Sequence, residues 1–337
     1  MISAIQTLSF VLIGNTIMEI HGMTLAHWLI LFTASCVSNM IGLNISAALD
    51  SVVTIYILIP FLIVPQLLFS GTMVKFDKLN KAISSYEVVP VIGDLMPSRW
   101  AYEAMAVKQF RDNEYMKNFF LIEQKKSEAA YIGSYLVPAL NNKIAKLANA
   151  DEETRNQIIG LLHTEVTKIN DRTPKQQFED IDLLTPEKYN DDVQENLTSF
   201  LDKTAKLYQQ KQNKAISVLD REISSLAEEL GGNKALVELK KNYTNEALSN
   251  FVLNRVDIEK IHDMGDHFIQ VSDPVYKEPE SRCGRAHFYA PFKQIGNLQI
   301  DTFWFNIIVM WIMNGLLYVL LVCDGLRWTI TKFSKQR

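Results

Sequence analysis

Four long stretches of this sequence contain no Asp, Glu, Lys or Arg, and they constrain the fold more than any other feature. They cover residues 1–18, 20–49, 51–74 and 302–323. A helix needs about 20 mainly apolar residues to cross a hydrocarbon core of about 30 Å. Buried helices of water-soluble proteins seldom extend so far without a polar face. Each stretch therefore predicts a membrane-spanning helix.

The expected spans are Ile2–Met18, Thr24–Ala48, Val52–Val74 and Thr302–Cys323. The first could also be a signal peptide, but it has neither a basic region before its apolar residues nor a small-residue cleavage site before the next span. We therefore expect an all-α integral membrane protein. It would have four transmembrane helices and a large, mainly helical extracytoplasmic domain inserted before the last span.

The distribution of charge predicts the orientation. The tail after Asp324 contains four basic residues and no acid: Arg327, Lys332, Lys335 and Arg337. The positive-inside bias places such a tail in the cytoplasm. The expected domains are a transmembrane bundle at 1–75, an extracytoplasmic helical domain at 76–300, the last transmembrane helix at 301–326 and a basic cytoplasmic tail at 327–337. The expected location is the cell membrane, as a multi-pass protein of the bacterial inner membrane.

Composition bears on the partners of the outer domain. The chain has a formal net charge of −4 at pH 7, which argues against nucleic acid as a partner. Cys283 is the one cysteine outside the spans, so no disulfide can form within the outer domain. We expect this thiol to be reduced or buried, the alternative being a bridge to its copy in a second subunit. Sequons at Asn196 and Asn242 matter only in a glycosylating host.

The outer domain shows helical periodicity. Apolar residues recur at steps of three and four between Leu201 and Leu230, which predicts a long amphipathic helix that ends at Gly231. The apolar stretch 236–256 is expected to return antiparallel against it as a helical hairpin. Further helices are expected around 114–130, 137–148 and 153–169. The segment 273–299, rich in Pro and Gly, is predicted to be an extended, looped return to the membrane.

Polar residues recur inside the first three spans. They are Asn15, Ser35, Ser38, Asn39, Asn44, Ser46 and Gln66. In lipid, such groups form hydrogen bonds with adjacent helices or line a wet cavity. We expect helix–helix hydrogen bonds for most of them, with contact to a transported substrate as the alternative. Pro60 and Pro65 predict a bend in the third span, because each removes a backbone hydrogen bond.

Known catalytic motifs are missing from the sequence. It contains no G-x-x-x-x-G-K-[ST] phosphate loop, G-x-S-x-G elbow, H-E-x-x-H pair or C-x-x-C pair. One cluster has metal-ligating residue types: His262, Asp263, Asp266 and His267. Gly265 interrupts any helix there and no further ligand is evident, so no metal site is predicted. The chain is therefore not expected to be an enzyme.

The end of the third span and the residues after it carry a family resemblance. Residues 67–74 read LLFSGTMV and residues 96–105 read MPSRWAYEAM, followed by Gln109-Phe110. This pattern resembles the permease part of ABC transporters of the White/G subfamily, the ABC-2 type membrane domain. In that family an apolar-Phe-Ser-Gly signature ends the fifth span, and a Pro-Arg-aromatic helix follows. The matching residues here are Phe69, Ser70, Gly71 and Arg99, while Gln109 replaces an acid of the family.

The resemblance covers residues 35–110 well and the last span only by position. It implies that the four spans correspond to the last four of six, so that the chain is a fragment or one piece of a split system. It further implies the permease part of an ATP-driven exporter, with the translocation path formed in a dimer. The implied partners are an ABC ATPase domain, a second copy of the permease and membrane lipid. The chain itself would hold no cofactor, because ATP and Mg would bind to the missing ATPase domain.

The resemblance also assigns roles to residues. Pro60, Val64 and Leu67 would face the translocation path, and Thr72 and Met73 would form the outer gate. The family closes this gate with two bulky aliphatic side chains, and Thr72 departs from that pattern. An alternative function is a membrane-anchored binding or signalling protein whose outer helical domain recruits a partner. Three closely connected spans with polar residues favour the transporter, since a simple anchor needs no such bundle.

Overall fold

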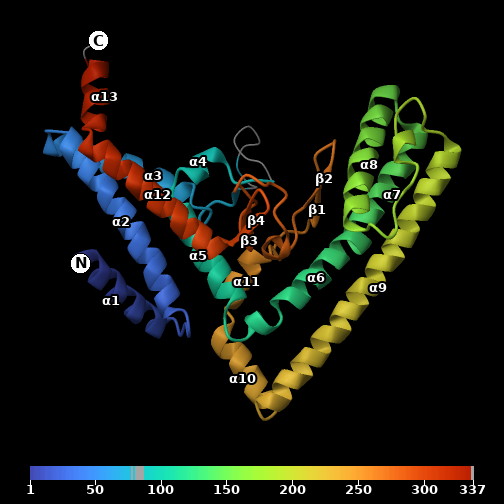
Figure 1. Ribbon diagram of the computed structural model, residues 1–337, viewed down its shortest axis with the longest axis horizontal. Helices are drawn as coiled ribbons and strands as arrows, with labels where there is room; N and C mark the ends of the chain where they lie inside the picture. Colours follow the sequence, from blue (N-terminus) through green and yellow to red (C-terminus); the bar gives the residue numbers. More distant parts are fainter. Residues whose placement is uncertain (77–78, 80–86, 335–337) are drawn as a thin grey trace. The chain divides into compact units, whose positions relative to one another are not determined.

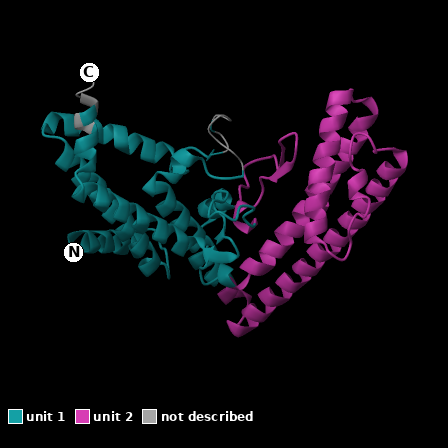
Figure 2. Cartoon of the chain, turned by 45° about the horizontal axis from the view of Figure 1, so that its top comes forward, with its two compact units in different colours: residues 1–117, 237–252, 278–337 teal, residues 118–236, 253–277 magenta. Residues whose placement is uncertain are grey.

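The protein is mainly helical and divides into two compact units (Figure 2). The structure is a computed structural model that describes residues 1–76, 79 and 87–334. Unit 1 comprises Met1–Lys117, Val237–Val252 and Glu278–Arg337, and unit 2 comprises Asn118–Leu236 and Leu253–Lys277. Residues 87–117, which follow the expected boundary of the transmembrane bundle at residue 75, pack with the apolar helices in unit 1.

Unit 1 contains the apolar helices: α1 (Ile2–Ile17), α2 (Thr24–Ala48), α3 (Val52–Leu68) and α12 (Thr302–Val322). By length and composition, α2 with 25 residues and α12 with 21 could cross a membrane. α1 and α3 are apolar but shorter, with 16 and 17 residues. α3 ends at Leu68 rather than at the expected Val74, because the Ser70 hydroxyl donates to the Leu67 carbonyl oxygen and Gly71 turns the chain.

Helix α2 lies between α1 and α12 (Figure 1). It packs against α1, α12 and α5 (Pro97–Arg111). The shared core includes Ile30 and Val37 from α2, Ala104 from α5 and Met310 from α12. The sequence indicated that these helices are apolar but not that α5 joins them, because α5 has no continuous apolar face.

Hydrogen bonds between helices are confirmed for three of the polar residues in the spans. The Asn15 carboxamide oxygen lies 3.2 Å from His27 Nδ1. Asn39 Nδ2 donates to Ser3 Oγ at 2.9 Å, which joins α2 to α1. Asn44 Nδ2 donates to the Leu317 carbonyl oxygen at 3.0 Å, which joins α2 to α12. These bonds satisfy donors that would otherwise be costly in lipid.

The remainder of unit 1 consists of short helices, a β-hairpin and connecting segments. It includes α4 (Val91–Asp94), most of α10 (Asn233–Tyr243), α11 (Glu246–Val252) and α13 (Gly325–Ser334). Strands β3 (Phe292–Ile295) and β4 (Leu298–Asp301) form an antiparallel hairpin in which Phe292 pairs with Asp301. The expected extended return is therefore partly a β-hairpin that leads directly into α12. Short strands of this kind are a departure from an all-α fold that the helical periodicity gave no reason to expect.

Unit 2 is built on a long helical column. It contains α6 (Phe120–Ala130), the π-helical turn η3 (Tyr131–Leu136), α7 (Val137–Lys146), α8 (Glu152–Arg172) and α9 (Asp191–Glu229), with a hairpin of β1 (Ile261–Asp263) and β2 (Phe268–Gln270). The π turn comes just before Pro138, whose missing N–H and ring disturb the preceding helical turn. Helices are thus present near all three expected ranges.

The long amphipathic helix is confirmed as α9, which has 39 residues, but its partner is not the expected one. α9 packs against α6, η3 and α7 (Figure 1), and most of the stretch 236–256 belongs to unit 1. The buried seam of α9 includes Leu197, Leu201 and Tyr208. The predicted hairpin is wrong. An apolar seam predicts that a helix packs against another element, but it does not specify which one.

Candidate functional site

A cavity of about 560 Å³ opens on unit 1 beside the end of α3. It is bounded by α2, α3, the turn after α3 and the start of α5. Side chains that line it include Ser38, Ile45, Ile63, Gln66, Leu67 and Tyr102. Within the described part of the chain, the lining contains no Asp, Glu, Lys, Arg or His. The cavity can therefore accept an uncharged, largely apolar group.

The turn that follows α3 shapes one side of this cavity. Ser70 Oγ lies 2.8 Å from the Leu67 carbonyl oxygen and 2.6 Å from Thr72 Oγ1. Gly71 has a φ of 81°, and a Cβ on it would lie 2.5 Å from the Phe288 ring. Only glycine fits this position without strain. Two residues of the recognised motif, Ser70 and Gly71, thus stop the helix and hold Thr72 at the cavity.

Helix α5 is attached to the end of α3 by a hydrogen bond. Ser98 Oγ donates to the backbone carbonyl oxygen of Gln66 at 2.8 Å. Pro97 occupies the first turn of α5, where its lack of an N–H costs nothing. The hydroxyl of Tyr102, one turn later, lies 3.2 Å from the Tyr289 hydroxyl. Helix α5 is thus joined to the end of α3 through Ser98 and to Tyr289 through Tyr102.

A buried ionic network fixes α5 to the segments around it. Glu103 Oε1 accepts a hydrogen bond from Lys293 Nζ at 2.8 Å, and Glu103 Oε2 accepts one from Asn306 Nδ2 at 2.9 Å. Arg99 approaches Glu103 at 3.5 Å and Asp94 at 3.7 Å. Lys293 belongs to β3 and Asn306 to α12, so one carboxylate joins three elements. Glu103, Lys293 and Asn306 are all 0% exposed.

Burial and ion pairing shift the pKa values of Lys293 and Glu103 in this network. Burial lowers the pKa of Lys293 to about 8, against the attraction of the Glu103 carboxylate. Burial favours a higher pKa for Glu103, but the positive charges of Arg99 and Lys293 outweigh it and hold that pKa below its ordinary value. The Arg99 guanidinium also lies 3.9 Å from the centre of the Trp100 ring, a cation–π contact. The Glu103 carboxylate therefore stabilises the buried positive charges of Arg99 and Lys293.

The expected path and gate residues fall into two groups. Leu67 and Thr72 line the cavity, whereas Pro60 and Val64 are exposed on α3 and do not line it. Pro60, Val64 and Leu67 are spaced four and three residues apart, which places them on one face of the helix. Met73, the other residue expected at the gate, is 72% exposed.

The motif residues Phe69 and Arg99 do not line the cavity. Phe69 is partly buried at the C-cap of α3, and Arg99 is buried in the ionic network. Sequence reasoning gave no role to Glu103, although its position four residues after Arg99 favours an ion pair on a helix. Lys293 could not have been found in the same way, because its nearness to Glu103 depends on the tertiary fold.

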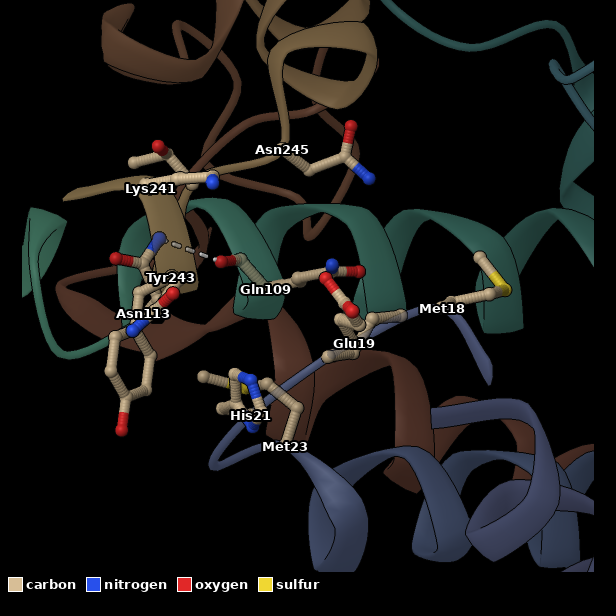
Figure 3. Close-up of a pocket in the computed structure, with 12 residues that line it drawn as sticks. Met18, Glu19, His21, Met23, Gln109, Asn113, Lys241, Tyr243 and Asn245 are labelled. Atoms are coloured by element: carbon tan, nitrogen blue, oxygen red, sulfur yellow. Dashed lines mark hydrogen bonds between the residues drawn. The ribbon is translucent and has the colours of Figure 1, made fainter. Parts of the chain in front are cut away.

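A second, smaller pocket in unit 1 has a polar lining. It has a volume of about 150 Å³ and lies between the link from α1 to α2, the end of α5 and the residues that join α10 to α11. Figure 3 shows Glu19, His21, Gln109 and Lys241 around it. The sequon residue Asn242 is also part of its lining. This volume suits a few water molecules rather than a transported molecule.

Members of the histidine and aspartate cluster of unit 2 have close polar contacts. The Asp263 carboxylate lies 2.6 Å from Lys143 Nζ, and His267 Nδ1 lies 2.7 Å from Asp266. Within residues 1–76, 79 and 87–334, no group of three or more His, Cys, Asp or Glu side chains could hold a metal ion. The Cys283 thiol, in unit 1, is free and exposed.

Comparison with protein families gives one match. Residues 1–110 match the family described as ABC-2 type transporter. Searches of curated proteins and of solved structures found no match. The matched region ends at Phe110, in α5, and thus includes α1–α3, the cavity and most of α5. It indicates the permease component of an ABC transporter, which is the membrane domain rather than the ATPase, and implies a location in a membrane.

Proposed function

We propose that the chain is the permease part of an ATP-driven exporter of the White/G type, in which two copies form the translocation path. The observation that carries the proposal is the match of residues 1–110 to the ABC-2 type transporter family. The attached ATPase would supply ATP hydrolysis and Mg binding. Binding of substrate with different affinity to inward- and outward-open states would couple hydrolysis to transport.

The exposure of α3 supports a path between two copies. None of the residues of α3, all of which the structure describes, is buried. Its surface includes Ile57 at 59%, Val64 at 50% and Leu67 at 49% exposure. In a bilayer such a face contacts either lipid or another helix. The proposed path residues Pro60, Val64 and Leu67 lie on this uncovered helix, and the proposed gate residues Thr72 and Met73 follow it.

The proposed topology places residues 76–300 outside the cytoplasm and both termini inside. The basic tail supports this orientation, because cytoplasmic ends carry an excess of Lys and Arg. Reporter fusions at Arg99 and Gln212 test it. Both positions should be accessible from outside. Location of both on the side of the basic tail would contradict the topology.

The transport proposal is tested by reconstituting the chain with an ABC ATPase partner and measuring ATP-dependent export. Leu67→Asp or Met73→Asp should abolish export, because each places a charge in the apolar path or its gate. Insertion into the membrane should be retained, as shown by resistance to carbonate extraction. Thr54→Asp, at an exposed position near the other end of α3, is the matched control.

Normal export by both charged variants would contradict the path assignment. A failure of the wild-type chain to stimulate any ATPase, together with capture of a soluble partner by unit 2, would favour the membrane-anchored binding protein instead. That alternative needs no cavity beside α3.

A further inference from the structure

Polar side chains of the apolar helices differ in whether the protein satisfies them. Asn15, Asn39 and Asn44 form hydrogen bonds with neighbouring residues or helices, although the buried Asn44 Oδ1 has no partner among the described residues. Gln66 and Ser38 both line the cavity, and neither side chain has a hydrogen-bond partner among the residues that the structure describes. A carboxamide without a partner is costly in lipid. Gln66 is half-buried at the cavity, so its carboxamide is free to bond to a group from outside the chain.

The other polar groups of the cavity are already engaged. Ser70 donates to the Leu67 carbonyl oxygen, and Ser98 donates to the Gln66 carbonyl oxygen, each at 2.8 Å. Tyr102 shares a hydrogen bond with Tyr289. Gln66 therefore offers the main unused donors and acceptor in a cavity whose apolar lining consists of aliphatic side chains such as Ile45 and Ile63.

We propose that this cavity is a binding site for a neutral, single-chain amphiphile whose uncharged hydroxyl or amide end bonds to Gln66. Its volume of about 560 Å³ lies within the range of about 300–1,000 Å³ common for small-molecule sites. The aliphatic side chains of α2 and α3 contact the acyl chain, and Ser38 provides a second polar contact. A charged head group finds no countercharge in the described lining and is excluded.

The proposal deepens the proposed function, since it names the class of molecule that the permease accepts. It shares Leu67 and Thr72 with the proposed path and gate, but one chain supplies all of its lining. The site also lies where α2, α3 and α5 meet. Displacement of α3 during transport would change its shape and release the amphiphile.

Photolabelling tests the proposal without any ATPase. The full chain is placed in phosphatidylcholine nanodiscs and exposed to three probes of equal chain length that carry a diazirine: a monoacylglycerol, a fatty acid and an alkylammonium. The monoacylglycerol should label peptides of α2 and α3 at the cavity. Gln66→Leu should weaken this labelling roughly three- to tenfold, as expected for the loss of a hydrogen bond. Thr54→Val, also on α3 but outside the lining, should label like the wild type.

A gain of function provides an independent result. Gln66→Glu places a carboxylate in the cavity and should shift labelling from the monoacylglycerol to the alkylammonium, whereas Ser38→Ala should weaken monoacylglycerol labelling less than Gln66→Leu does. Equal labelling by all three probes, or unchanged labelling of both Gln66 variants, would overturn the proposal. So would a disulfide between copies that forms through Ser38→Cys, because a second copy would then occupy the cavity.

The outcomes separate this site from the proposed function. Absence of selective labelling while Met73→Asp, outside the cavity lining, still abolishes ATP-dependent export would remove the site and leave the exporter. Selective labelling without ATP-dependent transport of the monoacylglycerol by the reconstituted complex would leave a lipid-binding site and count against the exporter.

Discussion

Helices α2 and α3 are neighbours in the sequence and both are apolar, yet α2 is partly buried in the protein and α3 is not. α2 has seven buried residues and packs against α1, α5, α12 and α13. α3 is the more apolar helix and has no buried residue along its described length. In water, the more apolar helix would be the more deeply buried one. The reversed order is what a bilayer predicts, because lipid provides no hydrophobic force between helices.

The difference follows from the side chains that each helix carries. α2 has His, Asn, Thr, Ser and Gly among its residues, and small or polar groups hold helices together in lipid. α3 consists mainly of aliphatic and aromatic residues, which acyl chains and protein accommodate equally well. Helix packing within one copy therefore involves α2, whereas α3 is left for lipid, a second copy or a bound amphiphile.

The largest expected effect concerns the network that holds α5 and α12 beside α2. Lys293→Met leaves Glu103 buried with too little positive charge and should destabilise the protein by about 3–5 kcal/mol. The measurement is unfolding by SDS in mixed micelles, followed by tryptophan fluorescence. Lys108→Met is the control, because its ion pair with Asp112 is partly exposed and should contribute less than about 1 kcal/mol.

The double variant Glu103→Leu with Lys293→Met sharpens this test. Replacing both charges by apolar groups removes the buried, unpaired carboxylate and should recover most of the lost stability. If the double variant is as unstable as the single one, the network acts through packing rather than through charge. Equal losses for Lys293→Met and Lys108→Met would contradict its buried character.

Truncation of matched isoleucines compares the two helices directly. Ile30 of α2 is 0% exposed and Ile57 of α3 is 59% exposed. Ile30→Ala should cost about 2–5 kcal/mol through lost packing, whereas Ile57→Ala should cost less than about 1 kcal/mol. The same SDS titration measures both. A larger loss of stability for Ile57→Ala than for Ile30→Ala in the isolated chain would show that α3 is packed against other parts of the protein. It would contradict the difference between the two helices.

A smaller effect, per unit of pH, comes from Lys293. Its pKa is about 8 in the folded protein and near 10.5 when exposed. Between these pH values the unfolded chain binds more protons, so the free energy of unfolding should rise with pH. The slope is at most about 1.4 kcal/mol per pH unit. Unfolding measured between pH 7 and pH 11 should show this rise relative to the double variant, which lacks both groups; a constant difference would contradict the assignment.

The smallest expected effect concerns the hydrogen bond from α2 to α12. Asn44→Leu removes the bond to the Leu317 carbonyl oxygen and should cost about 0.6 kcal/mol, with about 1.7 kcal/mol as the upper range in membranes. Thr54→Val on α3 should change stability by less than about 0.5 kcal/mol. SDS unfolding measures the free energy of unfolding of both variants. Equal losses would contradict the explanation that polar hydrogen bonds cause α2 to pack against other helices.

Sequence reasoning predicted the helices better than it predicted their partners. The charge-free stretches located α2 and α12 to within a residue, because apolar length is a local property. The turn at Ser70 and Gly71 was visible as a motif, but its role in ending α3 at Leu68 required the positions of Thr72 and Phe288. The expected pairing of α9 with residues 236–256 was wrong because the partner of a helix also depends on the tertiary fold.

Part of the candidate site could be predicted from sequence and part could not. Leu67, Thr72 and Gln66 belong to one stretch, so a resemblance or a polar residue in an apolar helix could identify them. The bond from Glu103 to Lys293 joins residues almost two hundred positions apart. No local pattern specifies such a contact, since either residue could equally have remained in water.

The sequence by itself determined that this protein contains long uncharged helices suited to lipid, a basic tail and a charged helical region, because the free energy of transfer from water depends on the residues of each segment. Only the tertiary structure decided that α2 is surrounded while α3 is not, and that Glu103 joins α5, β3 and α12. It also decided which polar side chains remain unbonded at the cavity. Those properties depend on which surfaces meet, and many arrangements of the same apolar helices would satisfy the bilayer equally well.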